Sequence, residues 1–524
     1  MSSVRLVSLG ILVSRLLGLA RDISMTAVFG GSTVLDAFLV AFRIPNLARQ
    51  VLGEGALSTA FLPVFMRSRD EEGELAARQT LTLVTLALTV VLSTFILIAE
   101  VGLWLAMTYL PLSESTFVLF SLLARMLPYA VLICVTALFC ATLHAQRQFF
   151  WPAVVPWFLN LIWLAGVFFV LRSNWSPVGQ AQVLASIVSF AGVVQLAIPY
   201  LALQSQGLGF AGNIQRSWPR LLEVTGAILP VVIGMTILQA SAILDSLIAW
   251  GFSKPDDGGT AWCELFGITP PLVAGTASAI YLGQRMLQFP MGVFGVALGT
   301  VLYPVLTRHA LSKEFDLLRN DLSRGLRLVI AIGIPASAGL AILAWPVAIA
   351  LFRHGKFSTA DTLMTAQMIA VYSGSVWSLI GVAILNRAWY AIGERIVPMR
   401  LGCIAVVVNQ LLNFLLIWPL GGMGLAWGNV ISSAGLCIVT LVALDRRVGP
   451  LGWSGLVHTL LKSGACTLIM SAVMLVAITF FNEPVSTVQR ILYLGIPGVL
   501  GAVTFLLAAR AVGMREVEDV LTRS

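Results

Sequence analysis

The chain has 524 residues, of which 58% are hydrophobic and 11% charged, with a net charge of +8 and a mean hydropathy of +0.93. Soluble domains are about a quarter charged and about half apolar. Because the apolar residues come in long runs between short polar connectors, the composition excludes a water-soluble multidomain enzyme, a disordered chain and a nucleic-acid-binding protein. We therefore expect an all-α polytopic membrane protein.

Fourteen apolar runs are long enough to cross a bilayer, because a spanning helix needs about 20 mainly apolar residues. Arg15, Arg21 and Asp22 interrupt the first run, whereas a cleavable signal sequence is uniformly apolar, so we expect this run to be a retained first helix. In chain order the runs cover about residues 4–29, 36–66, 79–108, 117–143, 149–171, 178–203, 222–250, 272–306, 325–352, 360–386, 397–417, 424–444, 457–481 and 490–513.

The basic residues predict the orientation of the chain. An even number of spans places both termini on one side, where the connectors carry fifteen arginine and lysine residues, against about five on the opposite side. Cytoplasmic loops are enriched in positive charge, so we expect both termini in the cytoplasm. On the opposite side, the connector 251–271 contains Pro255, Gly258 and Gly259 and is expected to be a flexible exposed loop.

Arginine dominates the positive charge, because the sequence has only four lysines. The guanidinium is a planar fork that matches phosphate or carboxylate oxygens, and it keeps its charge when buried. This favours an anionic ligand. The alternative, that most of these arginines only signal topology, stays open at this point.

A short internal repeat predicts two lobes. Residues 56–64 (ALSTAFLPV) recur as residues 297–305 (ALGTVLYPV), at an offset of 241. Two six-helix lobes would cover residues 1–206 and 222–445, joined by a linker at 207–221 and followed by two further helices in 446–524. Parallel repeats around a site near the membrane midplane are typical of transporters. The alternative is chance similarity between two apolar stretches.

Ionisable residues inside the spans are candidates for function, because each costs about 2.5 to 3.5 kcal/mol at the helix centre. Several arginines and few acids on helices 1, 2 and 8 would line one water-filled space that suits a polyanion. Pro45 should kink helix 2 and aim the residues after it toward this space. The candidates are Arg15, Arg21 and Asp22 in helix 1, Asp36, Arg43, Arg49 and Glu54 in helix 2, and Arg285 in helix 8.

A structural role is the alternative for some of these charges. Arg21 with Asp22, and Arg49 with Glu54, can form ion pairs that only hold helices together or reach the membrane interface. Arg125 in the fourth span, followed by Pro128, has no obvious partner in the sequence. We leave open whether Arg125 is functional or structural.

A second group of polar residues could bind a small cation. Asp245 interrupts helix 7, Asn409 and Asn413 share one face of helix 11, and Asn429 follows a glycine-rich break in helix 12. A carboxylate with several amide oxygens is suited to a hard cation such as sodium. Polar residues that hydrogen-bond between helices are equally common in membranes, so this alternative stays open.

Nothing in the sequence indicates catalysis. The four histidines lie in or beside connectors without a partner at metal or triad spacing, and the six cysteines have no metal or redox spacing. We therefore expect a transporter with no catalytic residues and no cofactor other than the possible sodium ion.

Several motifs resemble the MurJ (MviN) family of bacterial lipid II flippases, in the multidrug, oligosaccharidyl-lipid and polysaccharide exporter superfamily. They occur in family order across both predicted lobes. The motifs are SRLLGLARD at 14–22, DAF at 36–38, RIPNL at 43–47, EGA at 54–56, FPMGVFGVALGT at 289–300 and LFRHGKF at 351–357.

The resemblance implies export of lipid II, the undecaprenyl diphosphate-linked disaccharide peptide of cell-wall synthesis, across the bacterial inner membrane by alternating access. It implies fourteen helices with two lobes in a V shape, and a final helix pair that holds the lipid tail. It also implies a monomer whose partners are lipid II and membrane lipids, with no nucleic acid. The family's substrate-contacting arginines fall on Arg15, Arg21, Arg49 and Arg285, and its acids on Asp36 and Glu54.

The chain departs from the family at two points. Gln284 and Gln288 flank Arg285 where some members have acids, and Asn413 stands where sodium-binding members have an acid. Coupling to sodium is therefore in question, with membrane potential as the alternative. A flippase for another undecaprenyl-linked glycan and a cation-coupled drug exporter are the alternative functions.

Overall fold

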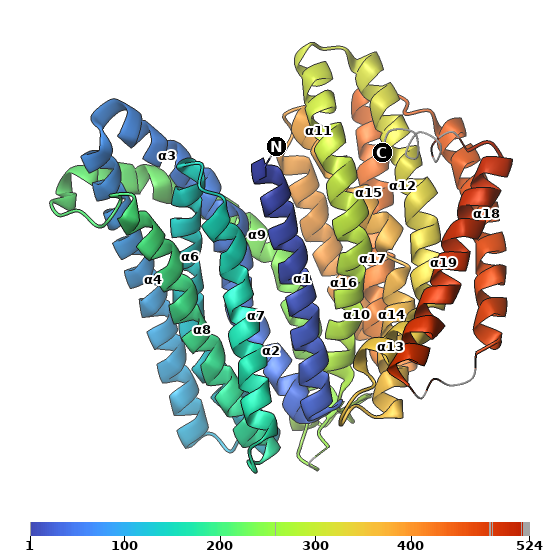
Figure 1. Ribbon diagram of the computed structural model, residues 1–524, viewed down its shortest axis with the longest axis horizontal. Coiled ribbons are helices and arrows are strands. Elements are labelled where there is room, and N and C mark those ends of the chain that lie inside the picture. Colours follow the sequence, from blue (N-terminus) through green and yellow to red (C-terminus); the bar gives the residue numbers. More distant parts are fainter. Residues whose placement is uncertain (1, 257, 482–483, 485, 515, 517–524) are drawn as a thin grey trace. The chain divides into compact units, whose positions relative to one another are not determined.

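The computed structural model describes residues 2–256, 258–481, 484, 486–514 and 516, and at some helical positions, Glu54 among them, it describes the backbone alone. Packing divides the chain into a first unit, Met1–Ala277, and a second unit, Ser278–Ser524. Within each unit, long helices run side by side (Figure 1). The prediction of an all-α polytopic membrane protein is confirmed.

Fourteen elements make up the first unit, and its helices are mostly long and apolar. They are α1 (Ser2–Phe29), α2 (Thr33–Ala48), η1 (Arg49–Ala56), α3 (Leu57–Glu72), α4 (Glu74–Tyr109), α5 (Glu114–Met126), α6 (Pro128–Ala145), α7 (Phe150–Leu171), α8 (Pro177–Ser205), η2 (Ile214–Ser217), α9 (Trp218–Gly251), β1 (Ser253–Lys254), η3 (Trp262–Phe266) and β2 (Leu272–Val273).

The second unit begins within α10 and is also helical. Its elements are α10 (Thr276–Pro290), η4 (Met291–Gly295), α11 (Val296–Leu311), α12 (Phe315–Ile342), α13 (Ala344–Phe352), α14 (Thr359–Ser373), α15 (Val376–Ala391), α16 (Ile396–Leu420), α17 (Gly422–Val448), α18 (Trp453–Thr479) and α19 (Thr487–Ala511). The grouping places α9 in the first unit, although the sequence analysis starts the second lobe at residue 222. The predicted lobe boundaries stay a prediction.

Nine helices in the described part of the chain are long and apolar enough to cross a membrane, and a tenth span results if α14 and α15, which meet at 42°, count together. Four predicted spans, the first, second, seventh and eighth, are not among these ten. The second and the eighth are each divided into shorter pieces. Residues 33–72 are helical throughout but are split by η1, and residues 276–311 are split by η4. The exact number of fourteen spans stays a prediction.

Both dividing segments are π-helices, and they lie at matching places in the internal repeat. At the offset of 241, η1 corresponds to residues 290–297, which contain η4. The wide turn of η1 ends where the Leu57 N–H donates to the Leu52 carbonyl, five residues back. A proline lies shortly before each segment, Pro45 in α2 and Pro290 at the end of α10. Proline removes one helical donor and so favours such local rearrangement.

The connector 251–271 is not the flexible exposed loop that its composition predicts. β1 and β2 pair in parallel, with Ser253 opposite Leu272, and η3 buries Cys263. The Trp262 Nε1–H donates to the Thr116 Oγ1 at 2.8 Å, which fastens η3 to α5. Burial also raises the pKa of the Cys263 thiol, which lies outside the spans. The prediction was wrong because glycine and proline report local turns and not packing against distant helices.

Glycine permits close packing of α16 against α17 in the second unit. A Cβ on Gly424 would overlap the Leu416 carbonyl oxygen of α16, whereas a Cβ on Gly435 in the same helix would meet nothing within 4 Å. Gly424 is therefore a contact point between two backbones, which have no side-chain freedom to yield.

We predict that Gly424→Ala lowers the thermal unfolding temperature of the purified protein, at a cost of about 1–3 kcal/mol from overpacking. Gly435→Ala is the matched control, and it should be neutral or stabilising because alanine favours helix over glycine. Equal melting temperatures for the two variants would contradict the close contact at Gly424.

Candidate functional site

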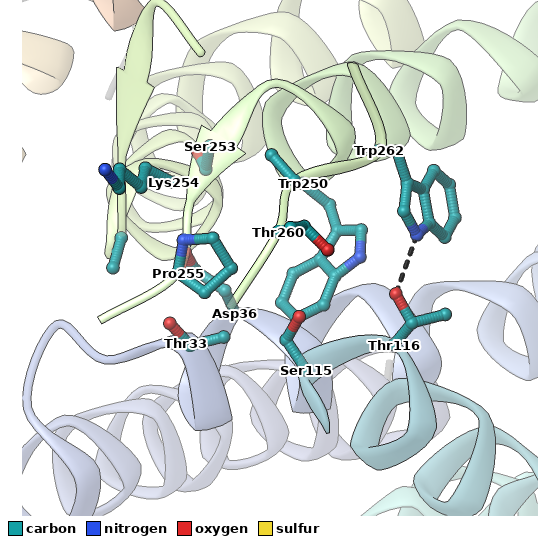
Figure 2. Close-up of a pocket in the computed structure, with 12 residues that line it drawn as sticks. Thr33, Asp36, Ser115, Thr116, Trp250, Ser253, Lys254, Pro255, Thr260 and Trp262 are labelled. Carbon is teal, nitrogen blue, oxygen red and sulfur yellow. Dashed lines mark hydrogen bonds between the residues drawn. The ribbon is translucent and has the colours of Figure 1, made fainter. Parts of the chain in front are cut away.

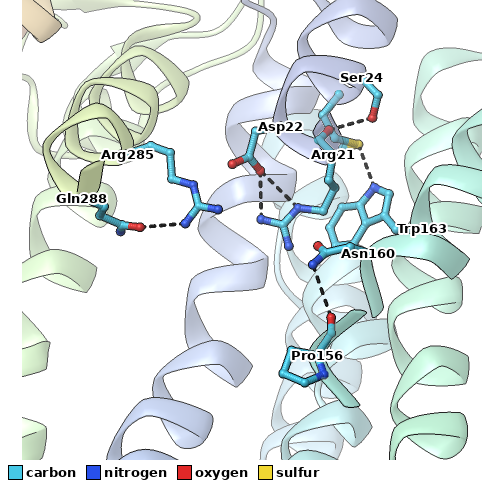
Figure 3. A network of polar contacts seen from close by, with 9 residues as sticks. Arg21, Asp22, Ser24, Pro156, Asn160, Trp163, Arg285 and Gln288 are labelled. Atoms are coloured by element: carbon cyan, nitrogen blue, oxygen red, sulfur yellow. Dashed lines mark hydrogen bonds and ion pairs between the residues drawn. The ribbon is translucent and has the colours of Figure 1, made fainter. Parts of the chain in front are cut away.

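Arg21 and Asp22 of α1 form a buried ion pair (Figure 3). The Arg21 Nη2 and Nε donate to the Asp22 Oδ1 at 2.8 and 3.1 Å, and the two side chains are 9% and 2% exposed. A buried ion pair offsets the cost of removing each charge from water only when its geometry is good. Here two N–H groups of the guanidinium donate to the same carboxylate oxygen, Asp22 Oδ1, at hydrogen-bond distance.

Aromatic rings from two other helices complete the environment of Arg21. Its guanidinium carbon lies 4.8 Å from the Trp163 ring of α7 and 5.3 Å from the Phe42 ring of α2. Phe42 in turn contacts Trp163 edge to face, with ring centroids 5.4 Å apart. A cation over a ring face is attracted by the ring's negative charge density, most strongly by tryptophan. Arg21 therefore joins α1, α2 and α7.

Arg43 is held by the backbone of α9. Its Nη1 donates to the Ala242 carbonyl oxygen. Ala242 and Asp245 lie three residues apart on α9 and so occupy neighbouring positions on one helix face. The Asp245 side chain is buried, with 1% of the residue exposed. Arg43 therefore contacts the face of α9 that carries the candidate cation ligand.

Arg49 begins the π-helix η1. Its Nε donates to the Asn46 Oδ1 at 2.9 Å, and the side chain is half-buried. The Glu54 side chain lies outside the described residues, so the predicted Arg49–Glu54 ion pair stays open. Arg15, also half-buried, lies six residues before Arg21 on α1, which corresponds to about 9 Å along the helix.

Asp36 lies at one end of α2, away from these arginines along the helix. Its Oδ2 accepts the Gly275 N–H at 2.8 Å, and the residue is 1% exposed. Thr33 and Asp256 exchange two hydrogen bonds nearby, from the Thr33 N–H at 3.3 Å and from the Asp256 N–H at 3.0 Å. Arg49 follows thirteen residues later, about 20 Å along the helix.

Gly275 owes its place beside Asp36 to its missing side chain. Its φ is +86°, and a Cβ there would lie 2.7 Å from the Gly31 carbonyl oxygen. Asp36 also lines a small pocket of about 10 Å³ with Thr33, Trp250 and Lys254 (Figure 2). Asp36 thus fastens the segment that leads into α10.

Arg285 belongs to the second unit, on α10. Its Nη1 donates to the Gln288 Oε1 at 2.7 Å, one turn along the same helix (Figure 3). The neutral Gln288, where some family members have an acid, therefore orients the guanidinium without cancelling its charge.

Arg387 is a further site candidate that the sequence did not reveal, because it falls among residues predicted to form a basic connector. The structure places Arg387 within α15, where its Nη1 donates to the Gly295 carbonyl at the end of η4 at 3.3 Å. The guanidinium lies against Gly299, where a Cβ would overlap it. The spacing of Gly295 and Gly299, four residues apart, was the available signal, because it leaves a smooth helix face for a large side chain.

The asparagines proposed to bind sodium form an amide network between α16 and α17. The Asn413 Nδ2 donates to the Asn409 Oδ1 at 3.4 Å, and the Asn409 Nδ2 donates to the Ser432 Oγ at 3.3 Å. Asn429 contributes its carbonyl, which accepts the Ser432 hydroxyl at 3.1 Å. These three asparagines lie in the second unit, whereas Asp245 lies in the first.

The residues that the structure describes contain no group of three or more His, Cys, Asp or Glu side chains that could hold a metal ion. A sodium site is built mainly from neutral oxygens with a single carboxylate. It therefore does not require such a group. The sodium site therefore stays a prediction.

We predict that Arg21→Gln destabilises the protein by about 3–5 kcal/mol, because it removes the guanidinium from the buried Asp22 carboxylate. The double variant Arg21→Gln/Asp22→Asn should recover most of the lost melting temperature, since both charges are gone. If transport stays lost in the stable double variant, Arg21 also acts on the substrate; if transport returns, the pair is structural.

Comparison with known proteins agrees with the motifs. The family model described as "Lipid II flippase MurJ" matches residues 25–495. A "Probable lipid II flippase MurJ" of Buchnera aphidicola is 30% identical, and the match covers 97% of this chain and 96% of the relative. The "Lipid II flippase MurJ" of Burkholderia cenocepacia is 29% identical, with 83% and 82% covered.

Solved structures agree on the fold. "Lipid II flippase MurJ, inward closed conformation" has a TM-score of 0.76 at 22% identity and covers 97% of this chain and 98% of its own. An inward-facing multidrug resistance MATE family transporter of the MOP superfamily has a TM-score of 0.61 at 14% identity, with 85% and 98% covered. The family model and the relatives place this multi-pass membrane protein in the Lipid II flippase MurJ family, whose members are transporters and not enzymes.

Proposed function

We propose that this protein moves lipid II from the cytoplasmic to the outer leaflet of the bacterial inner membrane by alternating access, without covalent chemistry. The match to the lipid II flippase family over residues 25–495 carries the proposal. The arginines in α1, η1 and α10 supply the chemistry it requires, because the diphosphate of lipid II must be partly stripped of water as it crosses the bilayer.

The proposed substrate contacts divide the arginines into two roles. Arg15, Arg49 and Arg285 bind the diphosphate and the adjoining sugar acid, for which a fork of parallel N–H donors is better suited than an ammonium group. Arg21, whose Nε and Nη2 donate to Asp22, contributes to the substrate site while it stays in this ion pair. We propose that Arg43 and Asp36 position α9 and the start of α10, and that Glu54 belongs with Arg49.

Alternating access requires helices that bend without breaking. A π-helix bonds residues five apart, is rarely stable over long stretches and is frequent at functional sites. The π segments η1 and η4 lie within the second and eighth predicted spans, next to Arg49 and close to Arg285. We propose that these segments absorb the bending when the transporter changes its open side. The groove for the lipid tail would lie on α18 and α19.

The energy source is proposed to act through Asp245 or through the arginines. If sodium binds Asp245 with asparagine oxygens in one state more tightly than in the other, it shifts the equilibrium by that difference in affinity. Arg43, which contacts the same face of α9, is the competing source of charge compensation. In that case membrane potential, worth about 2.3 kcal/mol per charge per 100 mV, becomes the drive.

We predict that depletion of this protein in a strain without a second flippase lowers outer-leaflet lipid II, measured by leaflet-specific labelling. Complementation by Arg15→Ala, Arg49→Ala or Arg285→Ala should fail at normal membrane abundance, and each lysine variant should rescue poorly. Arg172→Ala, an exposed arginine outside this group, is the control and should complement. Unchanged outer-leaflet lipid II would overturn the proposal, and normal growth of the alanine variants would make these arginines structural.

We also predict that sodium raises the melting temperature of the purified protein and that Asp245→Asn abolishes this shift. Choline chloride at equal ionic strength controls for general salt effects. Sodium-independent melting of the unmutated protein, together with full activity of Asp245→Asn, would identify Asp245 as a structural acid.

A further inference from the structure

A groove on the first unit lies between α5 and α8 and is separate from the residues discussed above. It has a volume of about 500 Å³ and opens to the surface. Its lining includes Arg125 of α5, Trp175 before α8, and the α8 residues Gln182, Ser186 and Phe190. Both helices belong to stretches that are apolar and long enough to cross the membrane.

Arg125 is an exposed arginine well inside a membrane span. It follows Glu114, the first residue of α5, by eleven positions, which corresponds to about 16 Å along the helix. Helical side chains lean toward the N-terminus of their own helix. The guanidinium therefore extends up the groove toward the level of Gln182, near the end at which α5 and α8 both begin.

Aromatic residues mark the membrane interface at that end. Trp175 is 47% exposed, and Trp104 and Tyr109 at the end of α4 are 56% and 72% exposed. Exposed tryptophan and tyrosine concentrate where lipid headgroups meet the acyl chains. The Arg125 side chain thus extends from the apolar interior of the membrane toward the lipid headgroups of this leaflet.

The groove is polar where the guanidinium lies and apolar below. The Gln182 Nε2 donates to the Ser121 Oγ at 3.4 Å, so the upper part already contains hydrogen-bonding groups. Further along α8, Ile187 and the 60% exposed Phe190 provide an apolar wall. Throughout the part of the chain that the structure describes, no carboxylate lies within ion-pair distance of Arg125, and the lining contains no acid.

We propose that this groove binds a phospholipid of the leaflet at the α5 and α8 N-termini, with the phosphodiester on Arg125 and an acyl chain along Ile187 and Phe190. The positive charge of Arg125 favours an anionic ligand. Because Arg125 lies inside a membrane span, this ligand must also carry a hydrophobic tail. Charge-assisted bonds from a guanidinium to phosphate oxygens are among the stronger protein hydrogen bonds. The resulting site is a lipid site on the flank of the first unit, distinct from the proposed lipid II contacts.

The test uses native mass spectrometry of the purified full-length protein, titrated with dioleoyl phosphatidylglycerol. Arg125→Gln should lose one bound lipid, with an affinity loss of roughly tenfold, as expected for a charged hydrogen bond. Arg125→Lys should retain part of the binding. Ser186→Trp should block the groove while keeping the charge. Arg172→Gln, which removes an exposed arginine whose guanidinium carbon lies 3.8 Å from the Phe168 ring centroid, is the matched control and should bind normally.

Several results would overturn the proposal. One is equal lipid retention by the unmutated protein and Arg125→Gln, which would mean that the guanidinium only reaches water. Another is an equal loss in Arg172→Gln, which would indicate general charge attraction. Displacement of the lipid by millimolar inorganic phosphate would show that the site takes a free anion. Melting temperatures of all variants, measured without added lipid, separate loss of binding from loss of folding.

Discussion

The cost of placing a positive charge in a membrane is the constraint on which the rest of this structure depends. A guanidinium cannot lose its proton to escape this cost, so each intramembrane arginine needs a compensating environment. Arg21 has the most complete one, because the Asp22 carboxylate lies along one edge of its guanidinium and the Trp163 and Phe42 rings lie nearby. The same contacts that stabilise the charge also join three helices of the first unit.

Other arginines meet this constraint through neutral oxygens. Arg43 donates to a backbone carbonyl of α9, Arg49 to an asparagine, Arg285 to a glutamine and Arg387 to the carbonyl at the end of η4. A neutral acceptor orients a guanidinium but leaves its net charge in place. The binding role proposed for Arg49 and Arg285 rests on their positions in η1 and α10, whereas Arg21 is held in a buried ion pair.

The backbone obeys a related constraint, because every peptide group within the bilayer must find a hydrogen-bond partner. The π-helices η1 and η4 widen a helix locally without exposing it, and in the case of η4 the Arg387 side chain binds the carbonyl at its end. That both lie at the same position of the internal repeat suits a transporter in which two similar halves change conformation. The lipid groove beside Arg125 shows the same principle at the protein surface, where the membrane itself supplies the anion.

The sequence by itself determined the membrane class, most helices and the family, because hydropathy and motif order are properties of neighbouring residues. The arginines and acids of the proposed site stay a prediction from the same motifs. The tertiary structure alone decided the partners of those residues. Trp163 lies more than a hundred positions from Arg21. Gly275 lies 239 positions from Asp36, and the packed connector 251–271 depends on Thr116. Local patterns report which face of a helix is apolar, but they carry no information about which distant helix covers that face. The π-helices were missed for the same reason, since their hydrogen-bond spacing differs from that of an α-helix by one residue while their composition does not.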